Sequence, residues 1–319
     1  MESQRDPALA ASALEGLIRY EEAPRQRSTP ERPAVAQIGP AKLRDCGGGG
    51  RPVVLVPSLI NPPDVLDLDD HVSLASAVAG MGRRALLLDW GRASERKDFD
   101  LGGHIEKLLL PLIHELDEQP VLVGYCLGGT MTIAAANLIE VERVATLAAP
   151  WRFSAYPEDS RASLSRLWDS SKGSAEQLRA LPMEVLQSAF WSLDPKRTVS
   201  KFARFAELPP DSDDARRFIT LEDWANEGEA LPFPAARELI EDLFGRDLSG
   251  SGAWRVAGRP ITDRLDCPLL NITASNDRIT PAATAPTGDI VHVDAGHVGM
   301  VVGSARAKLH KALAGFLLD

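Results

Sequence analysis

The chain has 319 residues, of which 44% are hydrophobic and 6% are aromatic. This length allows one large α/β domain, or a core domain that carries a sizeable insertion. The formal net charge of -10 argues against broad nucleic-acid binding, because phosphate recognition needs a clustered positive field, so we expect no nucleic-acid partner.

Residues 1–50 are predicted to form a peripheral N-terminal arm. The segment Pro7–Tyr20 has the amphipathic pattern of one helix. Prolines and a run of glycines then follow at a density that is typical of a linker rather than of a packed core. They are Pro24, Pro30, Pro33, Pro40 and Gly47 to Gly50.

Six short apolar runs are predicted to be strands that are buried on both faces of a parallel sheet. They are Pro52–Pro57, Arg84–Trp90, Pro120–Gly124, Val144–Ala148, Pro268–Thr273 and Ile290–Val293. The helical patterns between them are Val72–Met81, Leu101–Leu116, Thr130–Ile139 and Ser304–Leu317. This alternation predicts a doubly wound, mostly parallel α/β sheet built from residues 51–150 and 263–319.

Residues 151–262 interrupt the alternation and are predicted to be a helical cap inserted after the fourth strand. Strand character is weak here, and the helical patterns are Ala175–Leu193, Leu221–Glu229 and Ala235–Phe244. Five of the six tryptophans lie in this segment, all except Trp90. We expect most of them to pack in the interior, where an apolar cap would exclude water from a reactive intermediate.

The sequence Gly124-Tyr125-Cys126-Leu127-Gly128 has the spacing of a nucleophile elbow. An apolar strand precedes it and an apolar helix follows, as the sharp strand-to-helix turn requires. The helix N-terminus would place a positive field at the sulfur, which favours the thiolate. We therefore predict that Cys126 is the nucleophile of an α/β-hydrolase fold and that Leu127 N–H is an oxyanion donor.

In this fold the acid and then the histidine follow the nucleophile along the chain. Asp277 follows the fifth apolar run and His297 follows the sixth, so both would lie at the carboxyl edge of the sheet. We predict Asp277 as the acid, with Asp289 and Asp294 as alternatives, and His297 as the base. The other histidines are His71, His104, His114, His292 and His310.

A second oxyanion donor is expected from the loop after the first apolar run. This loop reads Ser58-Leu59-Ile60-Asn61, and either Ile60 or Leu59 would supply the N–H while Asn61 steadies the loop. The remaining alternative is an ordinary turn made by the neighbouring prolines.

Three cysteines do not describe a disulfide framework, which favours a reducing, cytoplasmic compartment. We find no secretory signal in residues 1–50 and no run near the ~18 apolar residues of a membrane span. Neither Cys46 nor Cys267 has a histidine at metal-ligand spacing, so we predict no metal. No dinucleotide or P-loop motif is present, so we expect no cofactor.

Six segments, in order from about Val53 to the C-terminus, resemble the polyhydroxyalkanoate synthases. They are VPSLINPPDVLDL, LLLDWG, VGYCLGGT, EDWANEGEALPFPAARELIEDLF, CPLLNITASNDRITP and GHVGM. The GYCLGG box is fairly specific for the cysteine nucleophile of that family. The variety that the segments most resemble is the short synthase that works with an accessory subunit.

This resemblance implies polymerisation of (R)-3-hydroxyacyl-CoA into an intracellular polyester with release of CoA. It implies that Cys126 is acylated, that His297 is the general base and that Asp277 is the acid. The CoA thioester would be the substrate, and the partners would be an accessory synthase subunit, a storage-granule surface and further copies of the chain.

Two other functions stay open on the sequence. The same three residues would serve an acyl-CoA thioesterase or a polyester depolymerase, if water were admitted. A binding protein on storage granules without catalytic activity is the alternative from another class.

Overall fold

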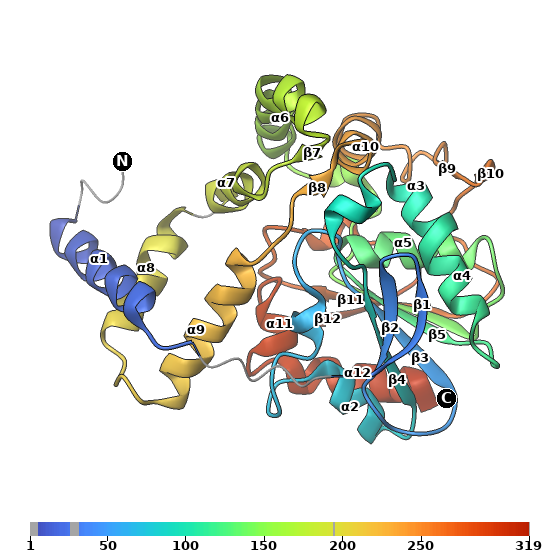
Figure 1. Cartoon of the computed structure of the whole chain (residues 1–319), viewed down its shortest axis with the longest axis horizontal. Helices are drawn as coiled ribbons and strands as arrows, with labels where there is room; N and C mark the ends of the chain where they lie inside the picture. Colours follow the sequence, from blue (N-terminus) through green and yellow to red (C-terminus); the bar gives the residue numbers. More distant parts are fainter. Residues whose placement is uncertain (1–5, 26–31, 194, 319) are drawn as a thin grey trace.

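The computed structural model describes residues 6–25, 32–193 and 195–318. Its centre is an eight-stranded sheet with the order β1-β2-β4-β3-β5-β6-β11-β12 (Figure 1). Neighbouring strands from β4 to β12 are parallel, whereas β2 is antiparallel to both β1 and β4. The strands are β1 (Ala34–Ile38), β2 (Ala41–Asp45), β3 (Pro52–Val56), β4 (Arg84–Asp89), β5 (Val121–Tyr125), β6 (Arg143–Leu147), β11 (Leu269–Ala274) and β12 (Asp289–Val293).

The six predicted apolar runs all form strands of this sheet, which confirms the doubly wound α/β fold. Burial on both faces is wrong for the sixth run, because β12 is an edge strand on which Ile290 and His292 are exposed. In β3, Val54 and Val56 belong to one apolar cluster, and Val53 and Leu55 belong to the cluster on the other face. Because strand side chains alternate between faces, a strand covered by helices on both sides must be apolar throughout.

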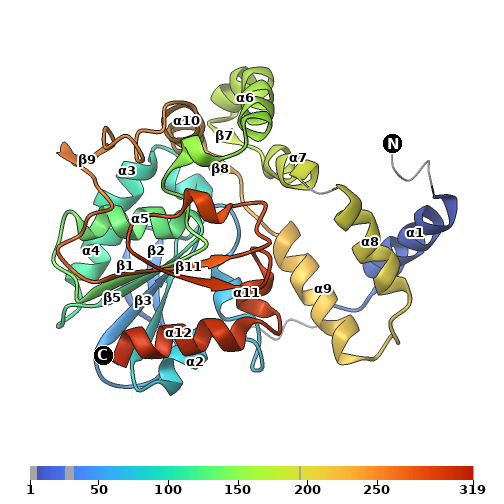
Figure 2. The same cartoon turned by 180° about the vertical axis from the view of Figure 1, so that it is seen from behind.

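The helices cover the sheet in two layers (Figure 2). On one face lie α2 (Leu74–Gly80), α11 (Gly299–Val302) and α12 (Arg306–Leu318). On the other lie α3 (Leu101–His104), the π-helical turn η3 (Ile105–Leu109), α4 (Leu110–His114) and α5 (Leu127–Ala136). Short 3-10 turns are η1 (Pro63–Leu66), η2 (Ala93–Arg96), η4 (Phe153–Ala155) and η6 (Ala282–Thr284).

Residues 34–45 lie in the main sheet, so the prediction of a peripheral arm over residues 1–50 is wrong for this part. They form the hairpin of β1 and β2, in which Ala41 and Leu43 are fully buried. The turn of the hairpin contains Gly39, whose φ of 53° is a conformation that favours glycine. Proline and glycine therefore mark a tight turn here rather than a linker.

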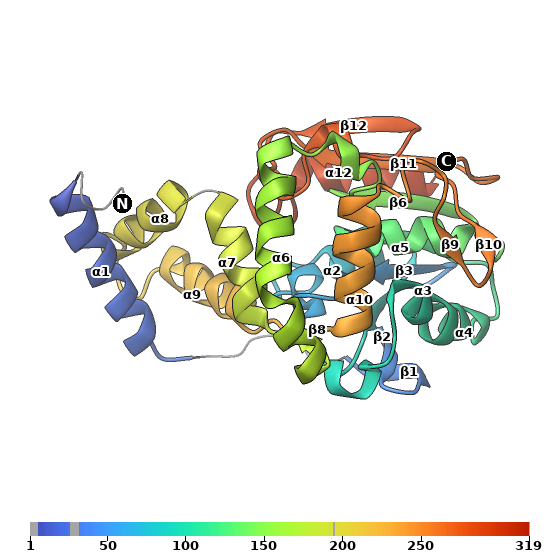
Figure 3. The ribbon, with the colours of Figure 1, turned by 90° about the horizontal axis from the view of Figure 1, so that it is seen from above.

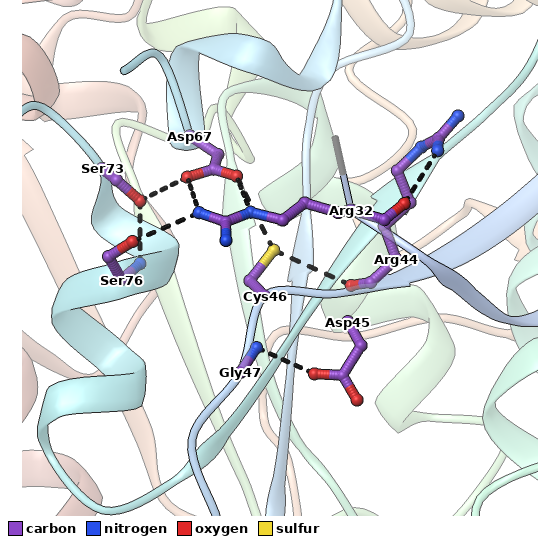
Figure 4. Close-up of polar contacts among 8 residues, drawn as sticks. All are labelled: Arg32, Arg44, Asp45, Cys46, Gly47, Asp67, Ser73 and Ser76. Carbon is purple, nitrogen blue, oxygen red and sulfur yellow. Dashed lines mark hydrogen bonds and ion pairs between the residues drawn. The ribbon is translucent and has the colours of Figure 1, made fainter. Parts of the chain in front are cut away.

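A buried carboxylate ties the chain before β1 to the core (Figure 4). Asp67 is 2% exposed and accepts hydrogen bonds from Arg32 Nε at 2.7 Å and from Arg32 Nη2 at 3.0 Å. Ser73 Oγ donates to the same carboxylate at 2.6 Å. The thiol of Cys46 lies 3.9 Å from it, and burial together with Asp67 raises the pKa of Cys46 to about 12. Since a buried carboxylate is costly without partners, Arg32 belongs to the core.

Residues 151–262 carry the helices that lie outside the two layers. They are α6 (Glu158–Leu178), α7 (Met183–Leu193), α8 (Pro195–Ala206), α9 (Asp213–Asn226), α10 (Phe233–Arg237) and the π-helical η5 (Glu238–Gly245). The single helix predicted over Ala175–Leu193 is wrong. The chain turns at Arg179, which has a φ of 59°, and β7 (Ala180–Leu181) then pairs with β8 (Leu231–Pro232). A second small ladder joins β9 (Arg255–Val256) to β10 (Arg259–Pro260).

The interior of this cap is apolar. Four of its tryptophans have described side chains, and all four are buried, as predicted: Trp151, Trp168, Trp224 and Trp254. The side chain of Trp191 lies outside the described residues. No helix in the described part of the chain is long and apolar enough to cross a bilayer.

The N-terminal helix packs on the cap. The helix predicted over Pro7–Tyr20 is α1 (Pro7–Glu22), and with α8 and α9 it forms an arm that projects to one side of the body (Figure 3). The contact with α8 is close at Gly16, where an added Cβ would lie 1.9 Å from the carbonyl oxygen of Phe202. Tyr20 and Phe205 are buried in a separate apolar cluster there.

Candidate active site

Cys126 lies at a sharp turn between β5 and α5 and has a φ of 55°. The turn brings strand and helix so close that only glycine fits around it. An added Cβ would lie 2.4 Å from Gly129 Cα if placed on Gly124, and 2.1 Å from Val56 O if placed on Gly128. A cysteine at positive φ is strained by about 1–3 kcal/mol, and such strain is typical of functional sites. The predicted elbow is therefore present as a structure.

His297 and Asp277 meet beside this turn. The Nδ1 of His297 lies 2.7 Å from Asp277 Oδ2, and both residues are 8% exposed. Asp277 follows β11 and His297 follows β12, so adjacent parallel strands deliver them to one edge of the sheet. The carboxylate accepts only, so Nδ1 carries the proton in this bond, and Nε2 is left for Cys126.

Cys126 and Asp277 both act on the pKa of His297. Burial lowers the pKa of His297, but Cys126 and Asp277, each through its charge and a side-chain hydrogen bond, raise it to about 10. Burial raises the pKa of Asp277, but His297 and the hydrogen bonds of Thr280 outweigh burial and bring it below its usual value. The structure thus brings all three predicted residues together.

The alternative residues lie elsewhere. Asp289 and Asp294 are exposed, and Asp294 accepts a hydrogen bond from Asn276 at 2.9 Å. His292 is exposed on β12 and contacts Thr273 Oγ1 at 2.7 Å. Geometry therefore selects Asp277 as the partner of His297.

Thr280 is a member of this cluster that sequence reasoning missed. Its Oγ1 lies 2.7 Å from Asp277 Oδ2 and 3.0 Å from His297 Nδ1, so it can donate to the carboxylate while it accepts from the imidazole. Its backbone N–H also donates to Asp277 Oδ1 at 2.9 Å. The only signal in the sequence is a threonine three residues after the acid, which is the spacing of an Asx turn.

Two tyrosines surround the site. The ring of Tyr125 lies 5.0 Å from that of His297, and its hydroxyl donates to the His297 carbonyl at 3.4 Å. Tyr156 follows β6 and is buried, and burial together with Cys126 and Asp277 raises its pKa. Sequence reasoning missed Tyr156, although the ends of parallel strands share one edge of the sheet.

The predicted oxyanion loop lies beside the start of α5. An added Cβ on Gly128 would lie 2.6 Å from the carbonyl oxygen of Pro57, the residue before this loop. Leu127 N–H is the first amide of α5. The N–H of Ile60 donates to Ser58 Oγ at 3.3 Å, so Ile60 would have to exchange this bond to serve as a donor. Leu59 is 2% exposed in the same loop.

Two hollows lie near these elements. A cavity of about 700 Å³ is lined by residues 58–64, Trp90, Arg96 and Glu229. A larger hollow of about 1950 Å³ lies between α1, α9 and residues 68–72. Neither lining includes Cys126, and the first cavity includes the predicted oxyanion loop. In the described part of the chain no three His, Cys, Asp or Glu residues are grouped to hold a metal ion.

Known proteins share this fold and sequence pattern. A model of the alpha/beta hydrolase family matches residues 31–310. The poly(3-hydroxyalkanoate) polymerase subunit PhaC of Haloferax mediterranei is 26% identical over 276 residues, which cover 79% of this chain and 55% of that protein. The protein of the same name from Thiocystis violacea is 24% identical over 290 residues, which cover 83% of this chain and 80% of that protein. The chain thus spans about half the length of the first relative.

Among solved structures, the bromoperoxidase from Bacillus anthracis superposes with a TM-score of 0.55 at 17% identity. The match covers 89% of this chain and 99% of that chain. At this identity the similarity supports the fold alone.

Proposed function

The chain belongs to the alpha/beta hydrolase family, and from this premise we propose that it is an acyltransferase that polymerises (R)-3-hydroxyacyl-CoA into polyhydroxyalkanoate. The observation that carries the proposal is the hydrogen bond of His297 to Asp277 beside a cysteine at a nucleophile elbow. Relatives named as poly(3-hydroxyalkanoate) polymerase subunits support the substrate class.

In the proposed site, His297 takes the proton of the Cys126 thiol and holds it on the ring. This follows from its raised pKa, because burial alone would favour the neutral ring and the two facing groups overcome it. Asp277 fixes the orientation of the ring through Nδ1 and stabilises its positive charge.

In the first step the Cys126 sulfur attacks the thioester carbonyl, and the oxyanion forms between Leu127 N–H and the loop that contains Ile60. The bond from the carbonyl carbon to the CoA sulfur breaks, and His297 gives its proton to the departing thiolate. An acyl-thioenzyme and free CoA remain.

In the second step the hydroxyl of another 3-hydroxyacyl group attacks this thioester. His297 takes the hydroxyl proton, the bond to the Cys126 sulfur breaks, and the ester is one unit longer. A thiol nucleophile suits this transfer, because exchange between thioesters is nearly balanced and the acyl group keeps its reactivity. The buried tryptophans of the cap would keep water from the intermediate.

We also propose that the chain works with an accessory synthase subunit, since its relatives are named as subunits. Of the eight exposed large hydrophobic side chains of the described residues, four lie on α1: Leu9, Leu14, Leu17 and Ile18. Apolar side chains gathered on a surface mark interaction sites, so α1 is the proposed contact. A homo-oligomer, a cytoplasmic location and attachment to storage granules are further proposals.

The test is incubation with (R)-3-hydroxybutyryl-CoA, in which CoA release is followed and the acyl product is identified. We expect polymer or oligoester, and a loss of roughly 10⁴-fold or more in Cys126→Ala. Cys267→Ala is the matched control, because Cys267 is a partly buried thiol before β11 and should keep full activity.

Free 3-hydroxy acid as the sole product would instead assign a thioesterase or depolymerase, which needs the same three residues. No CoA release, together with failure of iodoacetamide to label Cys126 in the folded protein, would favour the non-catalytic binding protein. Release that appears only after a second subunit is added would support the proposed partner.

A further inference from the structure

The cap holds the oxyanion loop through its α9 helix. The indole Nε1 of Trp224 donates to the carbonyl of Pro62 at 2.9 Å, and the N–H of Glu229 donates to the carbonyl of Ile60 at 3.2 Å. In the opposite direction, Asn61 Nδ2 donates a hydrogen bond to the carbonyl of Ala225 at 3.4 Å. Three consecutive residues of the loop, 60–62, are therefore bonded to the end of α9 and to the segment just after it.

Glu229 is anchored in turn by the core. Its carboxylate accepts a hydrogen bond from Ala93 N–H and lies 4.0 Å from Arg96 Nη2, whose side chain is 3% exposed. The cap and the loop approach each other so closely at the neighbouring Gly228 that a side chain would collide there. An added Cβ would lie 2.4 Å from Met183 Cε and 3.0 Å from Ile60 O. Glu229 thus connects cap, core and oxyanion loop.

The far end of the same loop is held independently. Asp67 is bonded to Arg32 and Ser73 as described above (Figure 4). Because the chain is fixed at β3 on one side and at Asp67 on the other, the segment 58–62 depends on α9 for its position.

We propose that Trp224 and Glu229 are positioning residues for acyl transfer, which hold the loop 58–62 where its N–H groups meet the oxyanion. This inference rests on the proposed function, in which Cys126 attacks an acyl carbonyl. Both act through backbone carbonyls of the loop, and a misplacement of about 1 Å at a reacting group can cost roughly 100-fold in rate.

The test compares Trp224→Phe and Glu229→Ala with matched controls elsewhere in the cap. Glu229→Ala removes the carboxylate that accepts from Ala93 N–H and anchors the bonded segment. Trp224→Phe keeps the ring and removes the donor. Trp168→Phe makes the same change where the indole bonds to Glu241 at 2.8 Å, and Glu241→Ala is the control for Glu229→Ala. We expect kcat to fall roughly 10-fold in the first pair with KM within about twofold, because loosening a donor costs less than removing it.

Alkylation of Cys126 by iodoacetamide is the readout that separates positioning from general damage. This reaction develops no oxyanion, so its rate should stay within about twofold of the wild type in all four variants. Hydrogen–deuterium exchange of the segment 58–62 should be faster in Trp224→Phe than in Trp168→Phe, whether or not the enzyme turns over.

The outcomes also separate this inference from the proposed function. If the wild type cleaves p-nitrophenyl butyrate but not the CoA thioester, the substrate class is wrong, and the variants are compared on the ester. Equal kcat and equal exchange in Trp224→Phe and Trp168→Phe would overturn the inference. So would a loss of kcat that is matched by an equal loss of alkylation rate.

Discussion

Thr280→Val is the substitution that most directly tests how the site is assembled. Thr280 is 4% exposed, and its hydroxyl contacts both Asp277 Oδ2 and His297 Nδ1. Valine has nearly the same shape, so the change removes the hydroxyl and little else. It leaves the carboxylate and the imidazole each with one hydrogen-bond partner fewer.

The size of the effect follows from the bond that is lost. A hydrogen bond to a charged group contributes about 1.5–3 kcal/mol. At 1.36 kcal/mol for each factor of ten, this corresponds to a fall in kcat/KM of roughly 10- to 150-fold if the bond acts fully in the transition state. Because the change does not alter the substrate pocket, most of the fall should appear in kcat.

The assay is CoA release by the wild type, Thr280→Val and Thr280→Ser, with thermal unfolding of each. Thr280→Ser keeps the hydroxyl and should recover most of the activity, which a purely packing role would not allow. The reasoning is refuted if Thr280→Val keeps kcat within twofold, or if valine and serine lose activity equally.

Two further predictions concern stability. Gly16→Ala should lower the melting temperature, because its Cβ would collide with Phe202 O. Gly173→Ala on α6 meets nothing within 4 Å and should raise the melting temperature, because alanine has the higher helix propensity. Thermal unfolding in which both variants shift in the same direction would contradict this. The pKa of His297 is raised from 6.5 to about 10, so the stability that it contributes is fully present below pH 6.5 and is lost as pH rises through about 10. Cys126→Ala removes one of the causes that raise the pKa of His297, so the stability contributed by His297 should be lost at a lower pH than in the wild type. Urea unfolding between pH 6 and 10 in which the variant superposes on the wild type would rule out this prediction.

Local patterns were sufficient for the parts of this protein that depend on neighbours in sequence. Five of the six apolar runs became strands that are buried on both faces, because their alternating side chains pack into the apolar clusters on either side of the sheet. The sixth, β12, is the edge strand of the sheet and is largely exposed. The glycines around Cys126 indicated the elbow for the same kind of reason, since no other residue fits between strand and helix.

Local patterns failed where the same residue types are compatible with two different structures. Pro40 contributed to the prediction of a linker, but with Gly39 it forms the turn of the hairpin of β1 and β2, and only the burial of Ala41 and Leu43 shows this. The helix predicted across Arg179 is broken by the ladder of β7 with β8, which pairs residues far apart in the chain. Propensity does not contain such long-range contacts.

The candidate site divides in the same way. The order of the residues along the chain pointed to Cys126, Asp277 and His297, because parallel strands deliver their carboxyl ends to one edge of the sheet. It left Asp289 and Asp294 open as the acid, and the contact of Asp277 with His297 decided between them. Which side chains support them was decided only by tertiary structure. Thr280 and Trp224 act across loops that meet in space, and their hydrogen bonds leave no periodic trace in the sequence.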